Sequence, residues 1–233
     1  MTFQPRITYV CTANVCRSQL AHYLTQQRLE ENPQLHLNKL GVEVSSSGVL
    51  ALPGQTICDQ VLPGEFITSE SLSKLFNAEM IDENSLILVM EQKHQSELIK
   101  QFPRLRQQIF VLRTATEIID KLALGIEDNS IFEAVDPEAN PGFSSPPLPD
   151  TLQERWQWML IELDAHRGML PFLGNIAPSE RFDVPDAHDQ PLTEHEYVRD
   201  LIHQSVGMLM ESLEKVLGAQ SMQGQSFETE GIR

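Results

Sequence analysis

The hydrophobic and polar positions of this chain predict short strands separated by helices. Compact apolar runs rich in β-branched residues are typical of strands, and the stretches between them have helical spacing. The predicted strands are 7–10, 42–46, 86–90 and 109–112, and the predicted helices between them are 18–31, 55–63, 70–80, 92–101 and 114–124. Strands that alternate with helices form parallel sheets covered on both faces. We therefore expect an α/β fold with a single open four-stranded parallel sheet and helices on both faces.

A long helix is predicted near the end of the chain. Thr193 and Glu196 have the spacing of a capping box, which marks a helix start, and Gly218 is a typical stop. An apolar stripe that we interpret as core packing runs along this helix through Tyr197, Leu201, Val206, Leu209, Leu213 and Leu217.

The stretch between residues 114 and 182 is longer than one helix and a turn require, and we interpret it as an insertion. Its first part is acidic and its residues 140–149 are rich in proline, which predicts an extended loop. Asp150 or Thr151, together with Glu154, can then cap a helix whose shared apolar face consists of Leu152, Trp156, Met159, Leu160 and Leu163.

Two interpretations of this insertion remain open. Its helix either docks on the main domain through Trp156, or the segment forms a lid or partner surface near a functional site. Either way, we expect one domain over residues 1–218 that contains the inserted acidic loop and helix at about 114–182, followed by a flexible tail at 219–233.

Composition narrows the classes of function. The formal charge is −16, with 17 basic and 33 acidic residues, which argues against a nucleic-acid partner. Three cysteines do not make a disulfide framework, so a reducing cytoplasm is expected. No stretch has the pattern of a membrane span or a signal peptide, and no metal-ligand spacing occurs. We expect a cytoplasmic protein with no membrane contact, no metal ion and no cofactor, and the sequence leaves its oligomeric state open.

The segment from Cys11 to Ser18 is the strongest candidate for chemistry. Cys11 lies where an apolar strand ends, and Arg17 immediately precedes the helix predicted at 18–31. Open α/β sheets bind ligands at such a strand-end position. Loop N–H groups and the helix N-terminus favour a tetrahedral oxyanion, and an arginine adds a planar two-pronged clamp. A thiolate in that position would be stabilised as a nucleophile. The alternative is that Cys11 is merely a buried small hydrophobic residue.

The segment from Tyr9 to Ala21 resembles the phosphate-binding loop of the low-molecular-weight protein tyrosine phosphatases, a loop that follows the first strand. Four later segments resemble that family in the same order along the chain, namely 44–49, 73–81, 86–94 and 183–186. The resemblance implies a phosphomonoester hydrolase, in the first place a protein tyrosine phosphatase. Its substrate would be a phosphorylated protein or a small aryl phosphate, and inorganic phosphate would be the product.

The resemblance also assigns roles within the loop. Cys11 would be the nucleophile that forms a phosphocysteine, and Arg17 would bind the equatorial phosphoryl oxygens. The other substrate-binding residues would be Thr12, Ala13, Asn14, Val15, Cys16 and Ser18.

Three of these loop residues have alternative roles. Asn14 suits a sharp left-handed turn, whether or not it does anything further. Ser18 would donate a hydrogen bond to the thiolate, although by position it could also cap the helix. Cys16 either closes a reversible disulfide with Cys11 that prevents over-oxidation or is a buried loop cysteine. Cys58, in a stretch predicted to be helical, is interpreted as a packing residue.

The family's general acid corresponds best to Asp186. Here the sequence departs from the family, because Ala187 and His188 replace the proline and tyrosine that usually follow the aspartate, and Leu52 replaces a second aromatic residue. We interpret His188 as a solvated loop residue. Asp183 is the nearer rival and is expected to stabilise the loop, whereas an Asp-Pro dipeptide at residues 136–137 is a weaker candidate within the insertion.

Two other functions remain open. The segment from Arg17 to Ala21 also resembles the arsenate reductase branch of this fold, in which glutamine often follows the serine, as Gln19 does here. However, Cys58 does not lie where thioredoxin-linked reductases keep their shuttling cysteine, which is after the third strand. The missing proline and aromatic residues also fit a weakly active protein that only binds phospho-ligands.

Overall fold

A four-stranded parallel sheet positions every candidate residue of the loop. The structure, a computed structural model, describes residues 3–58, 60, 72–127, 148–167 and 182–219. The strands lie in the order β2-β1-β3-β4, which confirms the predicted sheet. Their bounds are β1 Arg6–Cys11, β2 Glu43–Gly48, β3 Ser85–Val89 and β4 Ile109–Val111. Because β1 is central and ends at Cys11, this sulfur lies at the carboxyl edge of the sheet.

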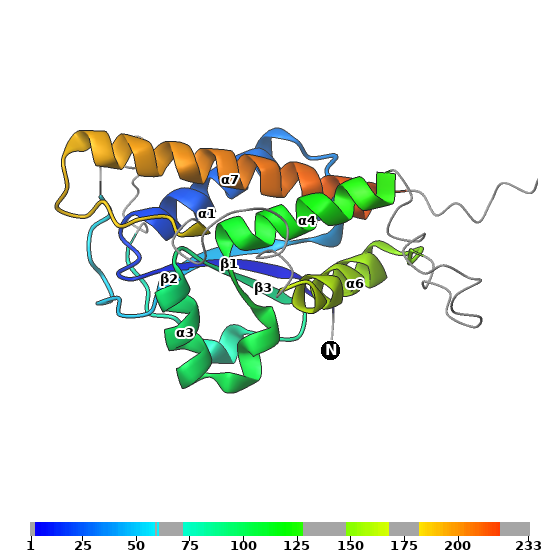
Figure 1. Cartoon of the computed structure of the whole chain (residues 1–233), viewed down its shortest axis with the longest axis horizontal. Helices are drawn as coiled ribbons and strands as arrows, with labels where there is room; N and C mark the ends of the chain where they lie inside the picture. The colour runs from blue at the N-terminus through cyan, green and yellow to red at the C-terminus, as the bar shows by residue number, and fades with distance from the viewer. Residues whose placement is uncertain (1–2, 59, 61–71, 128–147, 168–181, 220–233) are drawn as a thin grey trace, which may run out of the picture.

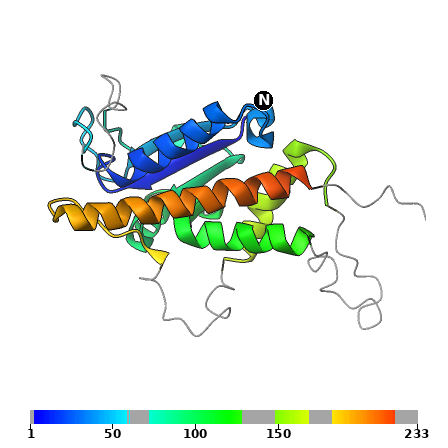
Figure 2. The ribbon, with the colours of Figure 1, turned by 90° about the horizontal axis from the view of Figure 1, so that it is seen from above.

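Helices cover the two faces of the sheet unequally (Figure 1). Three helices pack on one face, and Figure 2 shows the last of them lying between the other two. These are α1 Arg17–Glu31, α4 Leu112–Glu127 and α7 Leu192–Gly218. The opposite face carries α3 Gln92–Gln101 and the 3₁₀ helix η3 Pro103–Gln108. Every residue of β3 is buried, as expected for a parallel strand covered on both faces.

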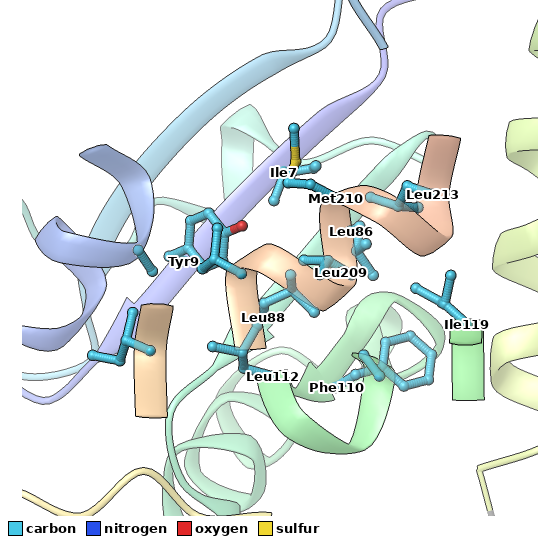
Figure 3. Close-up of a cluster of buried hydrophobic side chains, with 14 of the residues drawn as sticks. Ile7, Tyr9, Leu86, Leu88, Phe110, Leu112, Ile119, Leu209, Met210 and Leu213 are labelled. Carbon is cyan, nitrogen blue, oxygen red and sulfur yellow. The ribbon is translucent and has the colours of Figure 1, made fainter. Parts of the chain in front are cut away.

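The larger hydrophobic cluster joins the sheet to α4 and α7 (Figure 3). Alternate residues of β1, such as Ile7 and Tyr9, face Leu209 and Met210 of α7, because side chains alternate across a strand. The Tyr9 hydroxyl lies 2.7 Å from Thr25 Oγ1 of α1, so the one polar atom of this ring is satisfied. This packing fixes the start of α1 relative to the end of β1.

The inserted helix α6 Leu152–Ala165 docks far from Cys11. Thr151 and Glu154 form the predicted capping box, and the indole Nε1 of Trp156 donates to Asn84 O at 2.9 Å. Asn84 immediately precedes β3, so α6 packs at the edge of the sheet opposite Cys11. Docking through Trp156 is confirmed, and α6 is not a lid over the candidate site. The rest of the insertion, at 128–147 and 168–181, lies outside the described residues.

Two predicted helices are wrong where the structure describes them. Residues 55–58 are extended and form a bridge between Thr56 and Leu72, and residues 72–77 are extended beside the end of β2. Gly48 N donates to Lys74 O at 2.9 Å, and Phe76 N donates to Gly48 O at 3.0 Å. The backbone of these segments is therefore satisfied by tertiary partners rather than by helical hydrogen bonds. Only the 3₁₀ turn η2 Ala78–Met80 is helical in the described part of 70–80.

Two helices also differ from the prediction, one in where it begins and one because it was not predicted. Helix α7 begins at Leu192 after Pro191, and no side chain of the described region caps it, so Thr193 is not its cap. The short helix α2 His36–Leu40 was not predicted. The Glu214 carboxylate of α7 accepts hydrogen bonds from the His36 and Leu37 N–H groups at 2.8 and 3.0 Å. Such a cap from a distant part of the chain leaves no local sequence signal.

Candidate active site

The loop between β1 and α1 wraps around the Cys11 sulfur. The Asn14 N–H donates to Cys11 Sγ at 3.2 Å, and Ser18 Oγ lies 3.1 Å from the same sulfur. Gly48 of β2 lies directly beneath the loop, because a Cβ there would be 2.5 Å from Thr12 O and 2.8 Å from Asn14 N. The absence of a side chain at position 48 therefore lets the loop close around the sulfur.

Asn14 fixes both the turn and the direction of the Ser18 hydroxyl. Its φ is 57°, the left-handed conformation that asparagine tolerates. Its Nδ2 donates to Ser18 Oγ at 2.9 Å, and its Oδ1 accepts from Lys74 N at 2.8 Å. Because Asn14 fills an acceptor site of Ser18, the Ser18 proton is free to point at Cys11 Sγ. Helix α1 begins one residue earlier, at Arg17, so Ser18 is not its N-cap.

Arg17 joins three parts of the chain. Its side chain is 2% exposed and donates from Nη1 to Glu91 Oε1 and, at 3.0 Å, to Val184 O. Its Nη2 donates to Asp186 Oδ2 at 2.7 Å and to Thr12 Oγ1 at 3.3 Å. The structure thus brings Cys11, Arg17 and Asp186 to one edge of the sheet.

The loop that carries Asp186 is bonded to the end of β3. Val184 N donates to Met90 O at 2.8 Å, and Asp183 Oδ1 accepts from the Gln92 N–H at the start of α3, also at 2.8 Å. Asp183 therefore caps a helix, as expected for a loop-stabilising carboxylate. The Asp186 side chain is 39% exposed and faces the solvent side of Arg17. Asp136 lies outside the described residues.

Glu91 and His94 also contact the site, although no sequence pattern predicted them. Glu91 lies two residues after the end of β3. Burial disfavours its charge, but hydrogen bonds from Lys93 and Arg17 outweigh burial and lower its pKa. His94 Nε2 lies 2.8 Å from Thr12 Oγ1. Burial and the charge of Arg17 lower the pKa of His94 to about 4. The sequence did offer one signal for these residues. Both follow β3, which lies next to β1, and parallel strands end at the same edge of a sheet, so polar residues after β3 can reach the loop after β1.

The three cysteines gather around the loop as free thiols. Cys58 is half-buried, and its N–H donates to Val15 O at 2.8 Å, so it packs against the loop rather than lying in a helix. Burial and the neighbouring Cys58 raise the pKa of the Cys16 thiol, which makes it a weak nucleophile in the resting protein. The Cys11–Cys16 disulfide stays a prediction.

Cavities border the described fold both beside Asp186 and along β2. One of about 650 Å³ adjoins Asp186 and is lined by Glu91, Lys93, Arg113 and Tyr197 among others. Tyr197 of α7 is 54% exposed, so the prediction that it packs in the core is wrong. Its ring lines the same cavity as Asp186, although no aromatic residue follows Asp186 at position 187 or 188. Another cavity, of about 680 Å³, runs along β2 and is not lined by Cys11, Arg17 or Asp186.

Neither a metal site nor a membrane span emerges from the part of the chain that the structure describes. Within those ranges, no three His, Cys, Asp or Glu side chains are grouped so that they could hold a metal ion. The described helices include none that is both long and apolar enough to cross a membrane.

Comparison with known proteins gives one family. Residues 6–135 match the model for low molecular weight phosphotyrosine protein phosphatase. A protein-arginine-phosphatase from Geobacillus stearothermophilus is 34% identical over 111 residues, which span 46% of this chain and 69% of the relative. The low molecular weight protein-tyrosine-phosphatase Ptp from Acinetobacter johnsonii is 31% identical over 106 residues, or 46% of this chain and 70% of the relative.

The solved structures agree on the fold. A low molecular weight protein tyrosine phosphatase from T. tengcongensis superposes with a TM-score of 0.53 at 18% identity, covering 89% of this chain and 98% of that one. The tyrosine phosphatase Wzb from Escherichia coli K30, solved with phosphate, gives a TM-score of 0.52 at 14% identity, covering 88% and 96%. The sequence match at 6–135 contains the loop but not Asp186, so the assignment of Asp186 depends on its contacts.

Proposed function

Because the chain belongs to the low molecular weight phosphotyrosine protein phosphatase family, we propose that it hydrolyses phosphomonoesters through a phosphocysteine on Cys11. Arg17 is the phosphate clamp and Asp186 the general acid. The observation that carries this proposal is the position of the Cys11 sulfur, which accepts a hydrogen bond from Asn14 N–H and contacts Ser18 Oγ at the base of the loop. Both donors stabilise the thiolate form.

The chemistry has two steps. In the first, the Cys11 thiolate attacks phosphorus, the bond to the ester oxygen breaks, and Asp186 gives its proton to that oxygen. In the second, Asp186 takes a proton from water, the resulting hydroxide oxygen attacks phosphorus, and the Cys11 thiolate leaves with release of inorganic phosphate. The loop N–H groups and Arg17 stabilise the charge on the equatorial oxygens in both steps.

Arg17 and Asp186 form an ion pair before substrate binds. While this contact lasts, the Asp186 carboxylate is held against Arg17 Nη2. A phosphoryl dianion offers Arg17 Nη2 a stronger partner, so substrate binding releases Asp186 to carry the proton that the leaving oxygen needs. Arg17 Nη1 remains bound to Glu91 throughout and keeps the guanidinium in place.

We propose aryl phosphates, and phosphotyrosine in proteins, as the substrate class. Tyr197 lines the cavity beside Asp186, and Leu50, which is well exposed, donates its N–H to Thr12 O at the rim of the loop. Leu52 is 67% exposed two residues further on. These groups give a phenol apolar surface on which to rest.

Phosphoarginine is the second candidate substrate. Relatives that are named protein-arginine-phosphatases match this chain at 34% and 30% identity. The carboxylates of Glu91, Asp183 and Asp186 line the cavity next to the loop and would attract a guanidinium group. Both substrates would react through the same Cys11 and Arg17.

One preparation of the full chain can test these proposals with four reactions run in parallel. They are hydrolysis of para-nitrophenyl phosphate, of a phosphotyrosine peptide and of a phosphoarginine peptide, and reduction of arsenate with a small thiol. We expect turnover of the two aryl phosphates with a higher kcat/KM than for phosphoarginine, and no turnover by Cys11→Ser, which should still bind phosphate.

Other outcomes select the alternatives. Faster turnover of phosphoarginine would reverse the substrate assignment, and thiol-dependent arsenate reduction without ester hydrolysis would identify a reductase. Binding of phosphate without turnover of any ester would identify a phospho-ligand binder. A cytoplasmic location and a phosphorylated protein as partner remain predictions.

A further inference from the structure

The Thr12 hydroxyl lies between two nitrogen atoms. Arg17 Nη2 lies 3.3 Å from Thr12 Oγ1, and His94 Nε2 lies 2.8 Å from it on the other side. A guanidinium N–H only donates, so Arg17 fills one acceptor site of this oxygen. The role left for the hydroxyl proton therefore depends on whether His94 donates to Thr12 or accepts from it.

The surroundings of His94 favour a proton on Nε2. The ring is buried, and its Nδ1 has no hydrogen-bond partner among the described residues. A proton on Nδ1 would be a buried donor without an acceptor, and the Nε2 lone pair would face Glu91 Oε1 at 3.6 Å. With the proton on Nε2, the buried donor has an acceptor in Thr12 Oγ1, and an N–H rather than a lone pair faces the Glu91 carboxylate. Only Nδ1 then stays unpaired, as an acceptor. A doubly protonated ring would also donate from Nε2, so the direction of this hydrogen bond is the same in both states.

We propose that His94 is a positioning residue that turns the Thr12 hydroxyl into a donor to the phosphoryl group. With both acceptor sites of Oγ1 filled by Arg17 and His94, the hydroxyl proton has to find an acceptor elsewhere. Thr12 directly follows the nucleophile, and its oxygen lies beside the Arg17 nitrogen that the proposed function assigns to the phosphoryl oxygens. The inference rests on that proposed function for the position of the phosphoryl group. In this arrangement the Thr12 hydroxyl, a neutral side-chain donor, binds the phosphoryl group together with the loop N–H groups.

Phosphate binding can be measured without turnover. We expect iodoacetamide to alkylate Cys11 and inorganic phosphate bound in the loop to protect it. The phosphate concentration that halves the rate of Cys11 alkylation then reports the affinity for phosphate. The variants are Thr12→Val, which removes the hydroxyl at nearly constant shape, and His94→Leu, which removes the N–H. Their matched controls are Thr12→Ser, which restores a hydroxyl, and His94→Gln, which supplies an amide N–H.

We expect Thr12→Val and His94→Leu each to weaken phosphate about tenfold, the scale of one hydrogen bond to a charged acceptor. The two controls should stay within about threefold of the parent chain. The double variant should be no weaker than Thr12→Val alone, because His94 acts only through the hydroxyl. Melting temperatures of all variants separate loss of phosphate binding from loss of folding.

Several results would overturn the inference. Three results would each show that His94 does not act through the Thr12 hydroxyl. They are normal phosphate binding by His94→Leu, failure of His94→Gln as severe as that of His94→Leu, and losses that add in the double variant. Where His94→Leu does not fold, equal phosphate binding by Thr12→Val and Thr12→Ser would overturn it. If the variants show the expected phosphate affinities but the parent chain hydrolyses no ester, only the proposed function is rejected. If the parent chain hydrolyses esters but the variants do not show those affinities, only this inference is rejected.

Discussion

Arg17 and Asp186, which are 169 positions apart in the chain, meet through a 2.7 Å contact between Nη2 and Oδ2 at the carboxyl edge of the sheet. The arginine is buried, whereas the aspartate is more than one third exposed, so the ion pair marks the boundary between the protein interior and the open site. In the proposed mechanism, the phosphoryl group replaces Asp186 as a partner of Arg17. The first two predictions test the two members of this pair.

Replacement of Arg17 by lysine should lower kcat/KM for para-nitrophenyl phosphate by more than tenfold despite the retained charge. An ammonium group cannot contact Glu91, Val184 O and the phosphoryl oxygens at once with planar geometry. Steady-state kinetics measure the loss. Arg28→Lys is the matched control, because Arg28 of α1 pairs with Glu211 of α7 and does not contact the loop. Near-normal activity of Arg17→Lys would exclude the clamp.

Replacement of Asp186 by asparagine should slow hydrolysis of aryl phosphates by about a hundredfold, the usual scale for a positioned general acid. The defect should shrink for leaving groups of low pKa, which depart without a proton. Asp183→Asn is the control, because Asp183 caps α3 and its loss should lower the melting temperature more than kcat. If the two variants lost equal activity, or if Asp136→Asn lost more, the acid would have to be sought elsewhere.

Oxidation should produce a Cys11–Cys16 disulfide. Mild peroxide converts the Cys11 thiolate to a sulfenic acid, which Cys16 then attacks with loss of water. Cys16→Ser should keep near-normal activity but become irreversibly inactivated by peroxide, and Cys58→Ser should behave like the parent chain. Mass spectrometry of the peptides identifies the linkage. The same dithiol-reversible product in Cys16→Ser would remove Cys16 from this reaction.

Stability should decrease as the pH falls from 6.5 towards 4, in part because of His94. Its pKa is lowered from 6.5 to about 4, so in this window the unfolded chain binds a proton that the folded chain resists. This contribution to stability is therefore complete above pH 6.5 and is lost by about pH 4. His94→Gln should flatten the melting temperature against pH over that interval. An unchanged slope would show that His94 titrates normally in the folded chain.

Helix α6 should contribute to stability and not to catalysis. Trp156→Ala removes a fully buried ring and its hydrogen bond to Asn84 O, which should cost about 3–5 kcal/mol of unfolding free energy. Urea unfolding measures this cost, and the half-buried Trp158 provides the control Trp158→Ala, which should cost less. The kcat/KM of folded Trp156→Ala should be unchanged, and a lowered value would connect α6 to the active site.

Local signals predicted the parts of this molecule whose partners are close in sequence. The loop from Cys11 to Ser18 binds its own sulfur, and the capping box of α6 spans three residues, so both could be predicted from the chain alone. Glu91 was missed because its partner Arg17 is 74 positions away. The helices predicted at 55–63 and 70–80 were wrong for the same reason, since hydrogen bonds to the loop and to the end of β2 replace helical ones in the described parts. Spacing along one chain carries no record of such tertiary partners.

The close approach of Gly48 to the loop bears on protein design. A Cβ at that position would lie 2.5 Å from a backbone oxygen of the loop, where no side-chain rearrangement can relieve the clash. The eight residues from Cys11 to Ser18 are consequently not a portable module. A designer who grafts them between a strand and a helix of another scaffold must also provide a neighbouring parallel strand that ends in glycine at the register of Cys11.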